Sequence, residues 1–180
     1  GDYPMKESHR KAISLAEKAG MLISFDPNLR RPLWNDDEAL KKAVLEFLPL
    51  ADVLKLSDEE LFFLTGCHDI EEARPLLFQG RVQLIVYTEG AKGAFACTRE
   101  ACAQSPGISV KAVDTTGAGD AFIGSFLYQL FSRGLDAKTL STLSARELET
   151  MLDFSNRYCA CSVQKEGAIA SYPAAGDMQC

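Results

Sequence analysis

Apolar residues recur along the chain in two alternating patterns, one typical of helices and one typical of buried strands. Between Glu7 and Ala19 they fall at helical spacing, and Gly20 follows as a stop signal. The apolar run 21–25 then ends at Asp26-Pro27-Asn28, which is typical of a buried strand entering a turn. The alternation continues, predicting helices over 36–47, 57–66, 71–78, 121–131 and 145–164 and strands over 53–56, 84–87 and 94–97.

Strands that alternate with helices predict an α/β fold with a mostly parallel sheet covered by helices on both faces. The 180 residues contain no internal repeat and no low-complexity tract, so we expect one domain over residues 1–180. A hydrophobic content of 47% is enough for a sizeable core without metal or disulfide support.

The charge of the chain argues against nucleic acid and membranes as partners. Its formal net charge is −6, and lysines and arginines are scattered rather than gathered into a basic stripe. No apolar run approaches the roughly 20 residues of a membrane span, and the opening Gly1-Asp2-Tyr3-Pro4 does not resemble a signal peptide. A cytoplasmic location is therefore expected.

The six cysteines have no C-x-x-C spacing, and several lie in apolar surroundings. We therefore expect reduced, structural thiols rather than disulfides or zinc ligands. His9 and His68 are isolated in the sequence, which favours surface or loop positions over metal binding.

The strongest functional signal is the segment 113–122, Val-Asp-Thr-Thr-Gly-Ala-Gly-Asp-Ala-Phe. It places Gly117, Ala118, Gly119 and Asp120 where a turn enters an apolar helix. Glycines allow close backbone approach, and the unpaired N–H groups and positive dipole end of a helix start favour an anion such as a transferring phosphoryl group. Asp120 would lie beside that anion and accept the proton of an attacking hydroxyl.

An ordinary helix start, with turn glycines and an acid that complements the dipole, is the alternative interpretation. Phe122 stands where a dinucleotide fingerprint needs its third glycine, and the chain has no G-x-x-x-x-G-K-[ST] phosphate loop. The full string closely resembles the second signature of the ribokinase, or PfkB, family of carbohydrate kinases. This resemblance implies a three-layer αβα ribokinase-like fold, ATP-dependent phosphorylation of a sugar hydroxyl, and Asp120 as catalytic base.

The resemblance extends to the segment 26–34, Asp-Pro-Asn-Leu-Arg-Arg-Pro-Leu-Trp. It looks like the family's D-x-N-x-R segment, and the continuation Pro32-Leu33-Trp34 is similar to fructokinases in particular. Asn28 and Arg30 are thereby implied to face the active cleft near the sugar or the transferred phosphate. The alternative is a turn with a solvated arginine.

Two more elements are implied to lie along the nucleotide. The segment Ser57 to Glu60 resembles the family's N-x-x-E element. Ser57 stands at the asparagine position, which resembles a fructokinase-type variant. Glu60 is implied to organise magnesium and phosphates through water. The same two residues also form a helix capping box, and both roles are compatible. Thr88, Gly90 and Gly93 match the T-x-G-x-x-G turn, which an ordinary tight turn explains equally well.

Asn156 and the segment 167–173 look like the family's adenine-side helix and the loop that follows it. In relatives this loop helps to hold a monovalent cation, and the implied ligand residues here are Asp114, Thr116, Gly167 and Ser171. Oxygen ligands suit a hard cation, although a purely structural loop is the alternative. The implied cofactors are ATP and Mg²⁺, with K⁺ as the candidate monovalent ion.

The family's early glycine-rich, asparagine-bearing sugar motif is missing from this sequence. We therefore expect residues 1–180 to be the C-terminal nucleotide-binding and catalytic portion of a sugar kinase, without the N-terminal lid and sugar-binding portion. Such a half exposes a sheet edge and helix faces, which favours association, including a homodimer, or instability.

Fructose is the favoured substrate because of Pro32-Leu33-Trp34 and Ser57. The alternatives within the family are ribokinase, 2-keto-3-deoxygluconate kinase and nucleoside kinase activity. A non-catalytic nucleotide-binding relative is an alternative of a different class, and the intact Gly117, Gly119 and Asp120 argue against it.

Overall fold

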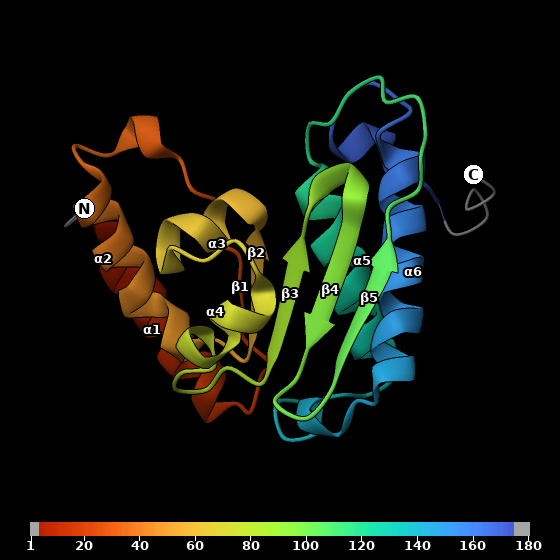
Figure 1. The fold of residues 1–180 in the computed structure, drawn as a ribbon. Coiled ribbons are helices and arrows are strands. Elements are labelled where there is room, and N and C mark those ends of the chain that lie inside the picture. The colour runs from red at the N-terminus through yellow and green to blue at the C-terminus, as the bar shows by residue number, and fades with distance from the viewer. Residues whose placement is uncertain (1–3, 175–180) are drawn as a thin grey trace. The chain divides into compact units, whose positions relative to one another are not determined.

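The computed structural model describes residues 4–174 as an α/β fold (Figure 1). Five strands belong to one mixed sheet in the order β1-β2-β3-β4-β5. The strands are β1 Ser24–Phe25, β2 Val53–Ser57, β3 Leu84–Thr88, β4 Gly93–Cys97 and β5 Cys102–Pro106. The helices are α1 Pro4–Lys18, α2 Asp37–Phe47, α3 Asp58–Thr65, α4 Ile70–Leu77, α5 Ala118–Ser132 and α6 Ala145–Ser162.

Each predicted helix and strand is present, and the α/β class is confirmed. The first strand is shorter than its apolar run, because only Ser24 and Phe25 pair with β2, in parallel, opposite Val53 and Leu54. The strand β5 was not predicted, because Cys-Ala-Gln-Ser-Pro has neither the alternation nor the β-branched residues of a typical strand. It pairs antiparallel with β4, so the sheet is mixed.

The chain groups into two compact units, which are described separately. Within the described residues, the first unit comprises 4–87 and 136–141. Its core contains the strand residues Leu54 and Leu56 together with Leu61 of α3 and Leu40 of α2, all nearly inaccessible to solvent. Buried Asp52 accepts hydrogen bonds from the backbone N–H of Ile23 (2.9 Å) and from Arg81, which fixes the chain ahead of β1. The prediction of one domain over the whole chain stays a prediction.

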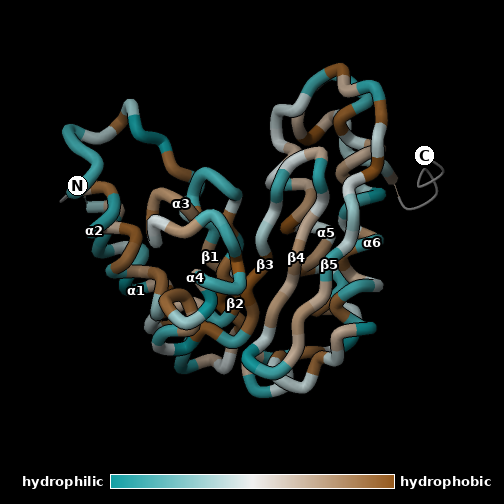
Figure 2. The backbone as a smooth tube through the Cα atoms, viewed as in Figure 1, coloured by the Kyte–Doolittle hydropathy of each residue, from teal (hydrophilic) through white to brown (hydrophobic). Residues whose placement is uncertain are grey.

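The second unit comprises residues 88–135 and 142–174 of the described chain. The helices α5 and α6 lie side by side, and α6 also packs on β4 and β5 (Figure 1). The core of this unit includes buried Phe126 and Leu130 of α5 and buried Leu148 and Met151 of α6. In Figure 2, β4 is hydrophobic along its length and the following turn is hydrophilic, as expected for a strand buried on both faces.

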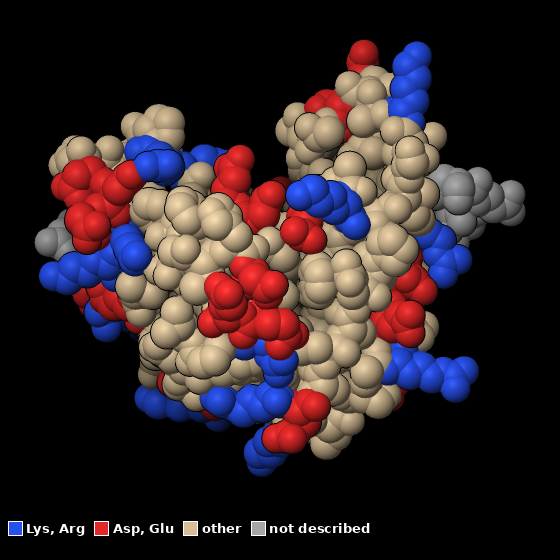
Figure 3. Space-filling model, in the orientation of Figure 1, with Lys and Arg blue, Asp and Glu red and all other residues tan. Residues whose placement is uncertain are grey.

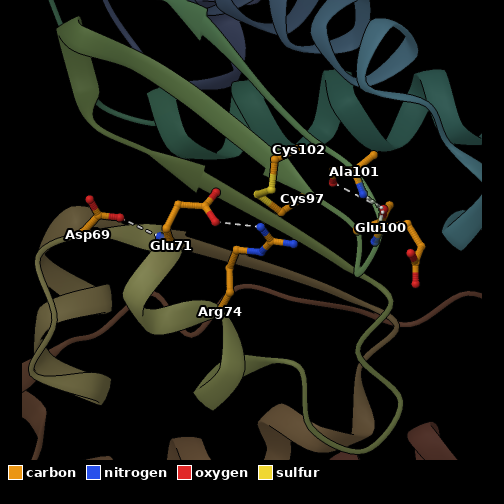
Figure 4. The surroundings of a disulfide bond; sticks show 8 residues. Asp69, Glu71, Arg74, Cys97, Glu100, Ala101 and Cys102 are labelled. Atoms are coloured by element: carbon orange, nitrogen blue, oxygen red, sulfur yellow. Dashed lines mark hydrogen bonds and ion pairs between the residues drawn. A yellow bond between two sulfur atoms is a disulfide. The ribbon is translucent and has the colours of Figure 1, made fainter.

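The expectation of reduced cysteines is wrong for Cys97 and Cys102, which form a disulfide between β4 and β5 (Figure 4), and for Cys161, which is also disulfide-bonded. Cys97 and Cys102 stand directly opposite each other in the strand register, with their Cα atoms 4.2 Å apart. Opposed residues on antiparallel strands come this close, so the pairing follows from the hairpin. Cys67 and Cys159 are free thiols.

Lysine and arginine side chains are interspersed with aspartate and glutamate on the face of the molecule in Figure 3. That distribution agrees with the scattered charges of the sequence. None of the helices in residues 4–174 combines the length and the apolar character needed to cross a bilayer.

Candidate active site

The start of α5 differs from the starts of α2, α3, α4 and α6 because no side chain caps it. The helices α2, α3, α4 and α6 begin after Asp36, Asp69 or a serine, whose side chain accepts a hydrogen bond from a first-turn N–H. The corresponding residue of α5 is Gly117, which has no side chain to offer. Within the described residues, the N–H groups of Gly119 and Asp120 therefore keep no acceptor and are open to an anion.

Gly117 is required at this position by both its conformation and its surroundings. Its φ of 76° is left-handed, and a Cβ atom would lie 2.9 Å from the Cβ of Ala168 and 3.0 Å from the hydroxyl of Tyr172. Its carbonyl accepts the N–H of Ala121 at 2.8 Å and the hydroxyl of Tyr172 at 3.1 Å. The turn that presents the free N–H groups is thus held from two sides.

A pocket of about 380 Å³ lies against this helix start, entirely within the second unit. Apolar side chains such as Ile108, Val110 and Phe122 form part of its wall. All four residues of this unit that were predicted to bind nucleotide line it: Thr88, Gly90, Gly93 and Asn156. The turn and helix start formed by residues 117–120, called the cradle below, borders the pocket through Ala118 and Gly119. An apolar pocket of this size that opens on unpaired N–H groups suits a base with attached phosphates.

Gly93 and Asn156 shape the pocket wall rather than projecting free polar groups into it. A Cβ atom on Gly93 would lie 2.2 Å from the carbonyl oxygen of Ser105, so only glycine allows β4 and β5 to approach this closely. The side-chain amide of Asn156 donates to the Ser105 hydroxyl at 2.8 Å and to the Pro106 carbonyl at 3.2 Å. These bonds fix the end of β5 against α6 at the edge of the pocket.

The four residues predicted to hold a cation lie in two adjoining loops. Asp114 accepts the N–H groups of Thr116 and Gly167, each at 2.9 Å, so one carboxylate joins the loops. Hydrogen bonds from the Thr116 side chain, and then from the Thr116 and Gly167 amides, hold the pKa of Asp114 below its ordinary value. The Ser171 hydroxyl donates to the Ala168 carbonyl at 2.7 Å, which places it beside Gly167 in the second loop.

The remaining predicted residues belong to the first unit, so the structure groups the site residues in two sets. Ser57 and Glu60 form the expected capping box at the start of α3. Glu60 is buried, with one carboxylate oxygen accepting the Ser57 N–H at 2.9 Å and the other accepting the Leu29 N–H at 3.0 Å. Glu60 therefore fastens the segment that carries Asn28 and Arg30 to the end of β2.

Asn28 and Arg30 are exposed on that fastened segment. Asn28 has a left-handed φ of 45°, and its N–H bonds to the carboxylate of Asp26 at 3.2 Å. Within residues 4–174 the Arg30 guanidinium forms no ion pair or hydrogen bond, which leaves its donors available to a ligand.

The protein-family model described as pfkB family carbohydrate kinase matches residues 4–175. The chain belongs to the pfkB family of carbohydrate kinases. The ribokinase-like fold inferred from the sequence is thereby confirmed for this pfkB chain.

Named relatives and solved structures agree with this assignment. The chain is 40% identical over 178 residues to Fructokinase-2 of Solanum habrochaites, covering 97% of this chain and 52% of that protein. Fructokinase from Xylella fastidiosa with bound ATP superposes with a TM-score of 0.86 at 32% identity, covering 98% of this chain and 56% of that one. A double mutant of fructokinase from Vibrio cholerae O395, bound to fructose, ADP and potassium, gives 0.84 at 35% identity, covering 97% and 55%. This pfkB chain thus spans about half the length of these relatives.

Two contacts of this pfkB chain near the predicted site were not predicted from its sequence. The hydroxyl of Tyr172 donates a hydrogen bond to the carbonyl of Gly117, 55 positions away, and no local sequence pattern predicts that contact. Buried Lys55 forms an ion pair with half-buried Asp26 at 3.1 Å, where the sequence shows only one lysine within an apolar strand. A charged residue in such a strand was the available signal, because a buried lysine needs a partner.

Proposed function

We propose that the polypeptide containing this chain transfers the terminal phosphoryl group of ATP to a sugar hydroxyl. The observation that carries the proposal is the partly apolar pocket against the start of α5, lined there by Ala118 and Gly119 and next to the free N–H groups of Gly119 and Asp120. The family and the ATP-bound fructokinase of Xylella fastidiosa support it. We further propose that this chain is the C-terminal, nucleotide-binding portion of that kinase.

The residues of the cradle have distinct roles in the proposed reaction. The N–H groups of Gly119 and Asp120, at the positive end of α5, stabilise negative charge on the phosphoryl group during transfer. The exposed carboxylate of Asp120 accepts the proton as the sugar oxygen attacks phosphorus. The pocket holds the base and positions the terminal phosphate against the turn.

Magnesium fits the proposal through Glu60, which keeps free lone pairs although each of its oxygens accepts one N–H. A water-mediated contact between Glu60 and the ion is compatible with these bonds. When bound, Mg²⁺ would neutralise phosphate charge.

The substrate that we propose is fructose. The support is the resemblance of Pro32-Leu33-Trp34 and Ser57 to fructokinases, together with a set of relatives named fructokinase. The fructose-bound structure of the Vibrio cholerae relative supports the same choice. Ribose, 2-keto-3-deoxygluconate and adenosine represent the alternative classes of substrate within the family.

The complete polypeptide should prefer fructose over ribose, 2-keto-3-deoxygluconate and adenosine by at least about tenfold in kcat/KM. A site that hydrogen-bonds particular hydroxyls rejects analogues that leave its polar groups buried and unpaired. Coupled measurement of ADP release with each acceptor tests the preference. A higher kcat/KM for any of the other three acceptors contradicts fructose while leaving the kinase proposal in place. ATP binding without turnover on any sugar would instead favour a non-catalytic nucleotide-binding relative.

A monovalent cation, proposed to be K⁺, should raise the rate by stiffening the loops next to the cradle. Asp114, Thr116, Gly167 and Ser171 would supply only oxygen ligands, as a hard cation prefers. Activity is compared in potassium and in tetramethylammonium salts at equal ionic strength, and potassium should give the higher rate.

Asp114→Asn should remove the difference between the two salts. Asp136→Asn is the matched control, because Asp136 also accepts bonds from nearby backbone N–H groups but lies outside the cation loops. Equal wild-type rates in the two salts would eliminate the cation site.

A further inference from the structure

Tyr172 connects two segments of the proposed site that are far apart in the sequence. It follows directly after the loop that contains Gly167 and Ser171, and its hydroxyl donates to the carbonyl of Gly117 at 3.1 Å. Gly117 begins α5 in a left-handed conformation. A side-chain donor next to the loop that contains Gly167 and Ser171 therefore reaches the backbone of the turn that presents the anion-binding N–H groups.

The Gly117 carbonyl has two donors, and they act differently on the turn. The N–H of Ala121 reaches it at 2.8 Å as the first hydrogen bond of the helix. The hydroxyl of Tyr172 comes from outside the helix and bonds to the second lone pair of the same oxygen. Because a peptide group is planar, fixing the Gly117 carbonyl also fixes the orientation of the peptide unit that leads to Ala118.

We propose that Tyr172 is a positioning residue that holds the Gly117 turn in the conformation presenting the Gly119 and Asp120 N–H groups and the Asp120 carboxylate. The inference rests on the proposed function for its catalytic consequence. It goes beyond the roles assigned to the signature segment, because Tyr172 lies outside that segment and contacts it only in the folded chain.

The Tyr172 hydroxyl acts as a donor because a phenol carries its proton at neutral pH and a carbonyl oxygen can only accept. The packing of the ring is a separate contribution, since the rings of Tyr172 and Tyr158 lie with their centroids 6.1 Å apart.

Tyr158 provides the matched control because it lines the same pocket as Tyr172 and Asp120. Within the described residues its hydroxyl has no hydrogen-bond partner. Tyr172→Phe removes only the bond to Gly117 and keeps the ring. Tyr158→Phe removes a hydroxyl from the same aromatic pair and leaves the turn untouched.

The first measurement is amide hydrogen exchange of the peptide that spans residues 113–124, in the polypeptide containing this chain. Tyr172→Phe should exchange several-fold faster in that peptide than wild type, while Tyr158→Phe should match wild type. Thermal unfolding should be similar for both variants. Unchanged exchange in Tyr172→Phe, or equal acceleration by both variants, overturns the inference whether or not the protein is an active kinase.

The second measurement is kcat and the KM for ATP in the same proteins. Loss of one neutral hydrogen bond that positions the turn should lower kcat about threefold to tenfold in Tyr172→Phe, with a smaller change in KM. Tyr158→Phe should leave kcat unchanged. A wild-type protein without any sugar-dependent turnover refutes the proposed function, and the exchange experiment still decides the role of Tyr172. Normal kcat in Tyr172→Phe alongside an active wild type contradicts the positioning role.

Discussion

Replacing Asp120 with asparagine should lower kcat of the complete polypeptide by at least about a hundredfold, with little change in the affinity for ATP. The amide has nearly the same shape as the carboxylate, so the cradle keeps its geometry. It cannot accept the proton from the attacking hydroxyl, however. Asp120 is exposed at the helix start that borders the nucleotide pocket, which is where the terminal phosphate is proposed to lie. Steady-state kinetics and calorimetric titration with ATP measure the two quantities.

The alternative role of Asp120, complementing the helix dipole, makes a different prediction. Such a residue contributes roughly 0.3–1 kcal/mol to stability and nothing to turnover. Asp58→Asn is the matched control, since Asp58 is an exposed acid in the first turn of α3. Both variants should unfold at nearly the same temperature, and only Asp120→Asn should lose turnover. Near-normal kcat in Asp120→Asn would refute its assignment as the base.

Local sequence patterns predicted the elements of the fold because each pattern reflects a local cause. The capping box at Ser57 and Glu60 and the apolar spacing of α5 and α6 act within a few residues of one another. The strand β5 has no such local cause. It is a strand because β4 lies beside it and α6 covers it, and the cross-strand pair Cys97–Cys102 depends on that placement.

The candidate site was predictable as a set of residue types but only partly as a set of contacts. The signature segment identified Gly117 to Asp120, and the pocket brings Thr88, Gly90 and Asn156 to the same helix start. The sequence could not show that the side-chain amide of Asn156 donates a hydrogen bond to Ser105 of β5. It also could not show that the carboxylate of Glu60 accepts the N–H of Leu29. These contacts join residues at least 31 positions apart, so they follow from the tertiary structure alone.

The ion pair between buried Lys55 and half-buried Asp26 should make a large and pH-dependent contribution to stability. Lys55→Met is expected to cost about 3 kcal/mol of unfolding free energy at pH 8, because removing Lys55 leaves the largely desolvated charge of Asp26 unpaired. The side chain of Lys55 is only 8% exposed and that of Asp26 is 19% exposed, at a separation of 3.1 Å. Lys42→Met, at an exposed position of α2, is the control and should change stability by less than about 0.5 kcal/mol.

The pH dependence of the Lys55→Met effect follows from the pKa of Asp26. Burial already raises that pKa above its ordinary value, and Lys55 is the main group that lowers it. Without Lys55 the folded-state pKa must rise further, so the folded protein binds the proton more tightly than the unfolded chain. Stability of the variant is then fully present below the unfolded pKa of about 4 and is lost as pH rises through the folded pKa. Urea unfolding from pH 4 to pH 8 should show a growing deficit relative to wild type, and Asp26→Asn combined with Lys55→Met should abolish that trend. A deficit that is the same at both pH values would show that Lys55 acts through packing rather than through its charge.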